Sequence, residues 1–179
     1  MWMTGTWLKY LLVWTGVFFF RLIPWRAPNV EPMLAAIMPF SKRYGWLGSF
    51  SFGFLGIVLY DAVTSGWGEW TWITAFSYGA LGFASHLYFQ KREATRANFV
   101  IFGIFGTLAY DALTGLTIGP LFHGQSFILA LTGQIPFTML HLAGVVLFAT
   151  VLSPLIYRYV VMNDSFELSG LWKRGLANS

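Results

Sequence analysis

The sequence predicts an all-α membrane protein, a bundle of about six transmembrane helices with an additional half-helix or re-entrant segment before the last helix. Two observations predict this class. Of the 179 residues, 56% are hydrophobic, 20% are aromatic and only 10% are charged, whereas a soluble domain carries about 25% charged residues. Charged residues are also absent between Trp70 and Gln90 and from Ala112 to Tyr157, and a membrane-spanning helix needs about 20 apolar residues.

Six apolar segments follow one another along the chain. The first is expected to be a retained helix rather than a cleaved signal peptide, because no small-residue cleavage site follows it. The second is short for a span at about 1.5 Å per residue, and Pro39 is expected to kink it. The segments are Trp7–Pro24, Val30–Phe40, Trp46–Val63, Trp70–Gln90, Ala97–Thr114 and Pro136–Val161.

The stretch from Leu116 to Gln134 is apolar but is interrupted by glycine, proline, histidine and glutamine residues. It fits either a seventh span or a half-helix that dips into the membrane. The positive-inside rule favours six spans with both termini in the cytoplasm. Nine of the 11 Lys and Arg residues then lie inside, and only Arg21 and Arg26 lie outside. The membrane itself is expected to be a prokaryotic inner membrane. Residues 1–162 would form a single transmembrane domain, and residues 163–179 a cytoplasmic tail, either a short helix on the inner leaflet or a disordered end.

An internal repeat links two of the predicted helices. The pattern FGxxGxxxYDAxT occurs at Phe52–Thr64 and again, 50 residues later, at Phe102–Thr114. Both copies run outward, so both Tyr–Asp pairs are expected near the outer ends of their helices. The repeated glycines, together with Gly48, are expected to permit close helix contact. Such repeats are common in transporters, and structural duplication of a helical hairpin is the alternative.

Asp61 and Asp111 each need a compensating partner, because a carboxylate at a helix C-terminus is opposed by the helix dipole. Arg21 and Arg26 are the only basic residues expected on that side. One interpretation is that the aspartates pair with these arginines or cap the following loops through backbone N–H groups. The other is that they form a polar ligand site at the outer face, since ionisable residues at membrane depth are functional candidates.

Aromatic and polar residues gather on the predicted outer side. They suit a flat, polar heterocycle held by stacking and a few hydrogen bonds, and a cationic ligand would add cation–π contacts. Each tryptophan by itself also fits an interfacial aromatic belt. Besides the two Tyr–Asp pairs, this surface contains Asn29, Glu31, Trp67, Glu69, Trp70, Trp72, His123, Gln125 and Gln134.

Catalytic and metal-binding patterns do not stand out in the sequence. Cysteine is absent, and His86, His123 and His141 have no HExxH or i,i+4 arrangement. A phosphate-binding glycine loop is also missing, so the chain is not expected to hydrolyse ATP itself. We therefore expect a binder rather than an enzyme, with no cofactor, no metal and no nucleic-acid partner.

Short motifs in a fixed order carry a family resemblance over most of the chain, from about Trp7 to Val161. After the first helix they are Arg21-Leu22-Ile23-Pro24, Pro28-Asn29-Val30-Glu31-Pro32, Lys42-Arg43-Tyr44-Gly45, Gln134-Ile135-Pro136-Phe137-Thr138-Met139-Leu140-His141 and Ser153-Pro154-Leu155-Ile156-Tyr157. In this order they resemble the substrate-binding S component of energy-coupling factor (ECF) vitamin transporters.

The resemblance implies a six-helix protein that captures a vitamin or related micronutrient near the outer face and docks onto a transmembrane coupling subunit and two ATPases. An accessory subunit of a larger membrane complex is the alternative. The AxxxA-type docking motif of the first helix is missing, so docking would use Ala35 and Ala36 or involve other partners. The candidate substrate-binding residues are Asp61, Trp67, Glu69, Trp70, Tyr110, Asp111, His123, Gln125, Gln134 and His141.

Overall fold

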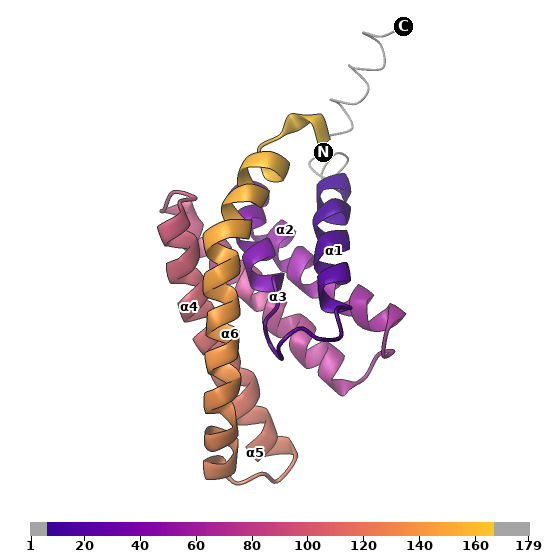
Figure 1. The fold of residues 1–179 in the computed structure, drawn as a ribbon, viewed down its shortest axis with the longest axis vertical. Helices are drawn as coiled ribbons and strands as arrows, with labels where there is room; N and C mark the ends of the chain where they lie inside the picture. Colours follow the sequence, from indigo (N-terminus) through magenta and orange to yellow (C-terminus); the bar gives the residue numbers. More distant parts are fainter. Residues whose placement is uncertain (1–6, 167–179) are drawn as a thin grey trace, which may run out of the picture.

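A computed structural model describes residues 7–166, and the secondary structure of this part of the chain is entirely helical, without β-strands. The prediction of an all-α protein is therefore confirmed. The start of α1 and the end of α6 lie at the same end of the molecule (Figure 1). The helices are α1 (Trp7–Arg21), α2 (Met33–Val63), α3 (Glu69–Gln90), α4 (Arg96–Leu113), α5 (Gly119–Phe122) and α6 (Phe127–Ile156), with π-helical turns at Thr114–Ile118 and Tyr157–Val161 and a 3-10 turn at Asp164–Phe166.

Helix α2 consists of two arms that meet at Gly45. This residue has φ 74° and ψ −177°, a conformation open essentially only to glycine. The chain reverses there, so that the rings of Phe40 and Phe52 stack with centroids 4.5 Å apart. Pro39 was predicted to kink this region, but it lies inside the first arm, and the non-helical residue is Gly45. The two predicted segments Val30–Phe40 and Trp46–Val63 thus correspond to the two arms.

Close helix contact at the repeated glycines confirms the packing prediction. A Cβ on Gly53 would lie 2.6 Å from the carbonyl oxygen of Tyr78, and one on Gly56 would lie 3.0 Å from the side chain of Met33. In the second copy, a Cβ on Gly103 would meet Val145 at 3.0 Å. The missing side chains let α2 approach α3 and let α4 approach α6, and dispersion contacts over these short distances hold the bundle together.

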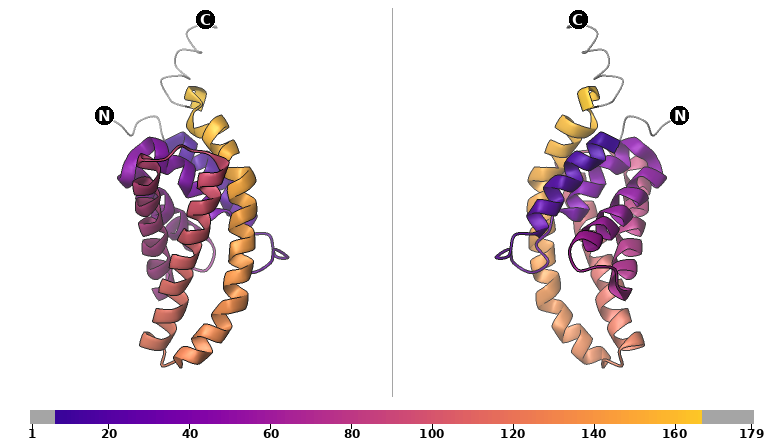
Figure 2. Two further views of the ribbon diagram at one scale, coloured as in Figure 1. Left: turned by 90° about the vertical axis from the view of Figure 1, so that its left-hand side faces the viewer. Right: turned by 90° about the vertical axis from the view of Figure 1, so that its right-hand side faces the viewer.

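The stretch from Leu116 to Gln134 does not form the separate half-helix that was predicted. Its first part extends α4 through the π-helical turn to Phe122, and its second part is the start of α6. The side chain of Ser126 accepts a hydrogen bond from the N–H of Leu129 at 3.3 Å, which caps α6 nine residues before its predicted start at Pro136. Figure 2 shows α4 and α6 continuing together as a long hairpin beyond the other helices.

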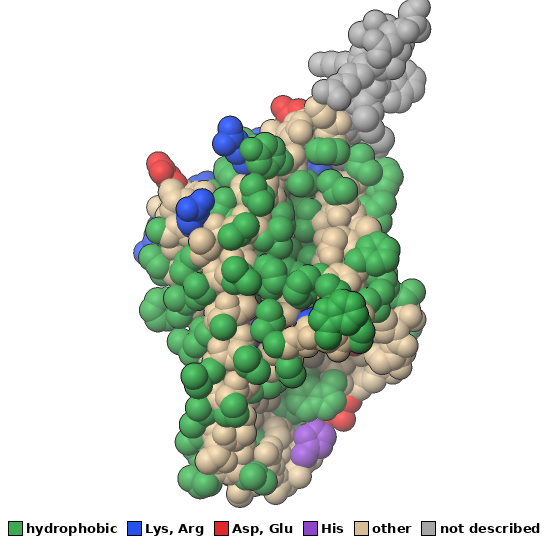
Figure 3. All heavy atoms as spheres, viewed as in Figure 1, with side chains coloured by type: hydrophobic (Ala, Val, Ile, Leu, Met, Phe, Trp, Pro, Cys, Tyr) green, Lys and Arg blue, Asp and Glu red, His purple; other side chains and the backbone are tan. Residues whose placement is uncertain are grey.

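Three helical stretches in residues 7–166 are long and apolar enough to cross a membrane, namely Met33–Val63, Arg96–Phe122 and Phe127–Val161. This composition indicates a membrane protein, whereas the number of six crossings stays a prediction. Lys and Arg side chains gather over the end where α4 starts and α6 ends (Figure 3). We call this the basic end; there Lys42 Nζ donates to the carbonyl of Arg92 at 2.8 Å, and Arg43 pairs with Asp164 at 3.5 Å.

Two further expectations change. Ala35 and Ala36 are fully buried, so the alternative docking surface proposed for them is wrong in this conformation; they are part of the core beneath α4 and α6. The predicted tail of residues 163–179 is described only as far as Phe166, and its remaining residues lie outside the described part of the chain.

Candidate functional site

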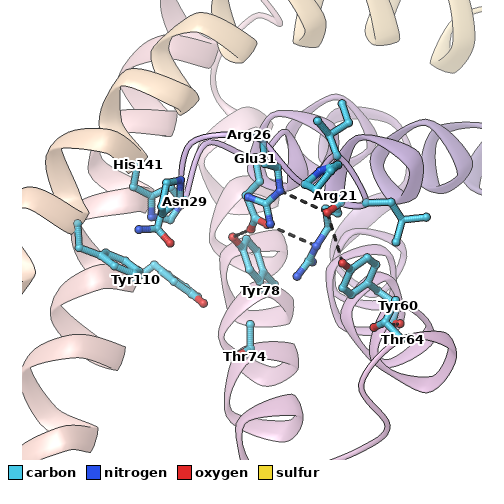
Figure 4. A pocket seen from close by; sticks show the side chains of 15 residues that line it. Arg21, Arg26, Asn29, Glu31, Tyr60, Thr64, Thr74, Tyr78, Tyr110 and His141 are labelled. Carbon is cyan, nitrogen blue, oxygen red and sulfur yellow. Dashed lines mark hydrogen bonds and ion pairs between the residues drawn. The ribbon is translucent and has the colours of Figure 1, made fainter.

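A cavity of ≈ 610 Å³ opens between the C-terminal ends of α1, α2 and α4, the inner parts of α3 and α6, and the linker between α1 and α2. We call it the arginine cavity. Its labelled residues point toward a common space from several helices (Figure 4). Ligand pockets commonly have volumes of about 300–1,000 Å³, so a small organic molecule fits. The lining consists of Arg21, Leu22, Ile23, Pro24, Arg26, Pro28, Asn29, Glu31, Tyr60, Thr64, Thr74, Tyr78, Tyr110, Phe137 and His141.

Arg21 occupies the centre of this lining, between Tyr60 and Tyr78 (Figure 4). Its Nε lies 3.5 Å from Oε2 of Glu31, and its guanidinium carbon lies 4.0 Å from the centroid of the Tyr60 ring. Tyr78 donates its hydroxyl hydrogen to Oε1 of Glu31. Within residues 7–166 the buried Nη1 of Arg21 has no hydrogen-bond partner. The cation is thus oriented by a carboxylate and a ring, yet part of its donor capacity is unused.

The linker from Leu22 to Pro32 carries further polar groups over the cavity. Helix α1 ends at Arg21, whose carbonyl accepts a hydrogen bond from Arg26 Nε at 3.3 Å. Asn29 has φ 64°, a left-handed conformation that asparagine tolerates better than most residues. Three prolines restrict the rest of the linker. This turn returns the chain toward α2 and places Glu31 beside Arg21.

Both tyrosines of the internal repeat line the arginine cavity, Tyr60 from α2 and Tyr110 from α4. The threonine that ends each copy donates its hydroxyl to the carbonyl of that tyrosine, at 2.8 Å from Thr64 and at 2.8 Å from Thr114. Tyr110 also contacts the ring of Tyr78, with centroids 4.9 Å apart. The duplication therefore has a structural counterpart: two equivalent helix ends contribute equivalent rings to one cavity.

The two aspartates of the repeat do not pair with arginines. Asp111 is 1% exposed, and its Oδ1 lies 2.9 Å from Nδ1 of His141; its Oδ2 has no hydrogen-bond partner in the described chain. Asp61 accepts a hydrogen bond from the Thr71 hydroxyl at 2.6 Å. The prediction that arginines compensate these carboxylates is wrong, because Glu31 occupies the position beside Arg21. A carboxylate at Nδ1 favours the tautomer of His141 whose Nε2 is an acceptor.

A second, smaller cavity of ≈ 290 Å³ lies beside the α4–α6 hairpin and contains four of the predicted site residues. The rings of Trp70 and His123 stack there, with centroids 6.0 Å apart and planes at 19°. Phe137 lines both cavities. The full lining of this cavity is Trp70, Thr114, Gly115, Gly119, His123, Gln125, Ala130, Gly133, Gln134 and Phe137.

The predicted site residues thus divide into three groups. Tyr110 and His141 line the arginine cavity, with Asp111 behind His141, whereas Trp70, His123, Gln125 and Gln134 line the smaller one. The remaining three belong to neither lining: Asp61 is bound to Thr71, Trp67 donates its indole N–H to the carbonyl of Val58 at 3.1 Å, and Glu69 begins α3.

Several lining residues escaped the prediction. Arg21 was considered only as a partner for the aspartates, and Glu31 only as part of the outer surface. Tyr60 could have been found, because it is equivalent to Tyr110 in the repeat. Tyr78 lies in the middle of an apolar helix, and no sequence pattern there predicts its hydrogen bond to Glu31.

The described residues contain no group of three or more His, Asp or Glu side chains that could hold a metal ion. What the arrangement can do is bind: it combines donors, acceptors and aromatic rings around one space. Comparison with protein-family models, with curated proteins and with solved structures finds no match for this chain.

Proposed function

We propose that the protein is the substrate-binding membrane subunit of an uptake transporter and holds a small micronutrient-like molecule in the arginine cavity. The observation that carries this proposal is an ionised, incompletely hydrogen-bonded arginine in a cavity of ≈ 610 Å³ inside an apolar bundle. A buried polar group without a partner costs about 1–3 kcal/mol. Such a cost is retained where a ligand supplies the missing partner, and ionisable groups at membrane depth are functional candidates for this reason.

In this proposal the chain crosses the membrane six times, through α1, each arm of α2, α3, α4 with α5, and α6. The reversal at Gly45 supports counting the two arms of α2 separately. The basic end would face the cytoplasm by the positive-inside rule. The arginine cavity, which lies at the opposite end of the second α2 arm, would then open toward the exterior. This orientation is the one in which a solute can be captured for uptake.

The resemblance to ECF S components supports the same function. A coupling subunit and ATPases would supply energy that this chain does not provide. On α1, Thr15 and Gly16 are exposed and would be the small residues available to such a partner. Copurification of the chain with ATPases from its native membrane would support this part of the proposal.

The test is thermal unfolding of the purified protein with a panel of vitamins and related heterocycles. We expect one compound, and not its close analogues, to raise the unfolding temperature. Thr74→Trp, which fills the arginine cavity, should abolish the effect, and Thr132→Trp on the exposed side of α6 should preserve it. An equal response to every compound, or none to any, would contradict the proposal.

An accessory subunit of a larger membrane complex is the second candidate. The tip of the α4–α6 hairpin favours it, because Leu121 is 75% exposed, Phe122 69% and Ile128 67%. Large exposed apolar patches mark interfaces with lipid or with other proteins. Stoichiometric copurification with membrane proteins other than ATPases, lost on Phe122→Ser, would favour this candidate.

A further inference from the structure

The hydrogen-bonding groups around the arginine cavity are unequally used. Both oxygens of Glu31 are engaged, Oε2 by Arg21 and Oε1 by the Tyr78 hydroxyl. The carbonyl of Arg21 accepts from Arg26 and, at 3.5 Å, from the hydroxyl of Tyr60. The carboxylate of Glu31 and the carbonyl of Arg21 therefore already have cationic or hydroxyl groups of the protein beside them.

The donors are not fully used. A guanidinium has five N–H groups and no acceptor, and Nη1 of Arg21 is buried without a partner in the described residues. Arg26, a second guanidinium, lines the same cavity and uses its Nε on the Arg21 carbonyl. A ligand that completes this arrangement must bring acceptors, and the strongest acceptors for a guanidinium are carboxylate and phosphate oxygens.

The same geometry disfavours a cationic ligand. Three tyrosines line the cavity, and such rings can bind a cation over their faces. The face of Tyr60, however, is already covered by the Arg21 guanidinium at 4.0 Å. A cation in the cavity would approach this fixed positive charge, and the carboxylate of Glu31 is already paired with Arg21 and accepts from Tyr78.

We propose that the ligand of the arginine cavity is an anion: a small aromatic acid whose carboxylate or phosphate group binds Nη1 of Arg21 and reaches Arg26, and whose ring lies against Tyr78, Tyr110 and Phe137. Tyr78 and Tyr110 form a tilted pair with planes at 36°, and Phe137 faces His141 at 6.2 Å. This inference rests on the proposed function, because it names the class of molecule that the cavity takes.

The experiment compares acids with their neutral analogues on the full chain in nanodiscs of phosphatidylcholine. The probes are benzoate and benzamide, indole-3-acetate and indole-3-acetamide, and benzylamine as the cation, with affinity measured by calorimetry. We expect at least one acid to bind tenfold or more tightly than its amide. Arg21→Gln should remove this preference by weakening acid binding at least tenfold more than amide binding.

Glu31→Gln should change the affinities for acidic and for cationic ligands in opposite directions. This variant therefore shows which charge the ligand carries. Removing this carboxylate leaves Arg21 without its counter-ion and should strengthen acid binding, whereas a cationic ligand would lose affinity. Arg43→Gln, at the basic end, is the matched control and should change nothing. If Arg21→Gln does not fold, Arg21→Lys keeps the charge but not the planar fork, and the comparison of acid with amide in the unmodified chain remains decisive.

An anionic lipid headgroup is the other source of the same chemistry. Nanodiscs containing phosphatidylglycerol should leave acid binding unchanged. If this lipid instead competes with the acid, and the competition depends on Arg21, the cavity binds a lipid headgroup and the proposal of a solute ligand is overturned. Equal binding of acid and amide, blocked by Thr74→Trp, would refute the anion while preserving the proposed function. Absence of binding by every probe would overturn both.

Discussion

The contact between Arg21 and Glu31 should be a strongly coupled ion pair. Each side chain is 13% exposed, and Nε and Oε2 are 3.5 Å apart. Replacing one partner leaves the other charge buried, which costs about 3–5 kcal/mol in comparable pairs. Because both groups border a cavity that admits water, we expect the lower limit: Arg21→Met should reduce the free energy of unfolding by about 3 kcal/mol.

The double variant Arg21→Met/Glu31→Gln should recover much of this loss, since no unpaired charge remains. The expected interaction energy in a double-mutant cycle is about 2 kcal/mol, within the range for residues in one network. Tyr78→Phe removes the hydroxyl that donates to Glu31 and should cost about 1 kcal/mol.

The assay is unfolding by sodium dodecyl sulfate in mixed micelles, followed by tryptophan fluorescence without ligand. The pair of Arg43 with Asp164 is a matched control, because its atoms are also 3.5 Å apart but its side chains are 39% and 77% exposed. The double-mutant cycle of Arg43→Met and Asp164→Asn should give an interaction energy of less than about 0.5 kcal/mol. Additive effects of the two substitutions at the cavity, within about 0.5 kcal/mol, would refute the reasoning.

Three further substitutions test the site and the packing. Asp111→Asn should weaken ligand binding about tenfold, or about 1.4 kcal/mol, and leave the bundle folded. The reason is that the neutral amide no longer fixes the orientation and tautomer of His141. An unchanged affinity would show that the role of Asp111 is purely structural. Gly82→Ala should destabilise the protein by about 1–3 kcal/mol, since a Cβ there would lie 2.6 Å from the carbonyl carbon of Ser49. Gly16→Ala, where the new Cβ would meet no described atom within 4 Å apart from its chain neighbours and the backbone of its own helix, should instead stabilise α1 by about 0.5–1 kcal/mol. Both substitutions are measured by the same unfolding assay.

The sequence predicted those parts of the fold that depend on local composition. Runs without charge marked α3 and α6, and the gap between the predicted segments Val30–Phe40 and Trp46–Val63 marked the reversal inside α2. The errors arose at prolines and glycines. Pro136 suggested a helix start, yet apolar helices tolerate an internal proline when neighbouring groups satisfy the freed carbonyl. The interruptions between Leu116 and Gln134 suggested a half-helix, yet a π-helical turn at Thr114–Ile118 continues α4 past them.

The candidate site was predicted in part, through the repeat and through the family resemblance. Tyr110, Asp111 and His141 were expected, and Tyr110 and His141 line the arginine cavity. The centre of the cavity was missed because Arg21 and Glu31 meet across the linker, and their contact depends on the turn at Asn29. Pairing between residues on a linker and residues on distant helices follows from tertiary packing, which local patterns do not encode.

The central claim is that the arginine cavity opens to the exterior and holds a solute, and thiol labelling tests it most directly. The chain has no cysteine, so single cysteines can be introduced without background: Thr64→Cys at the cavity and Arg43→Cys at the basic end, both at exposed positions. In intact cells, a membrane-impermeant maleimide should label Thr64→Cys, more slowly in the presence of the preferred acid. Arg43→Cys should react only after the membrane is permeabilised. The reverse pattern would place the cavity on the cytoplasmic side and contradict the account.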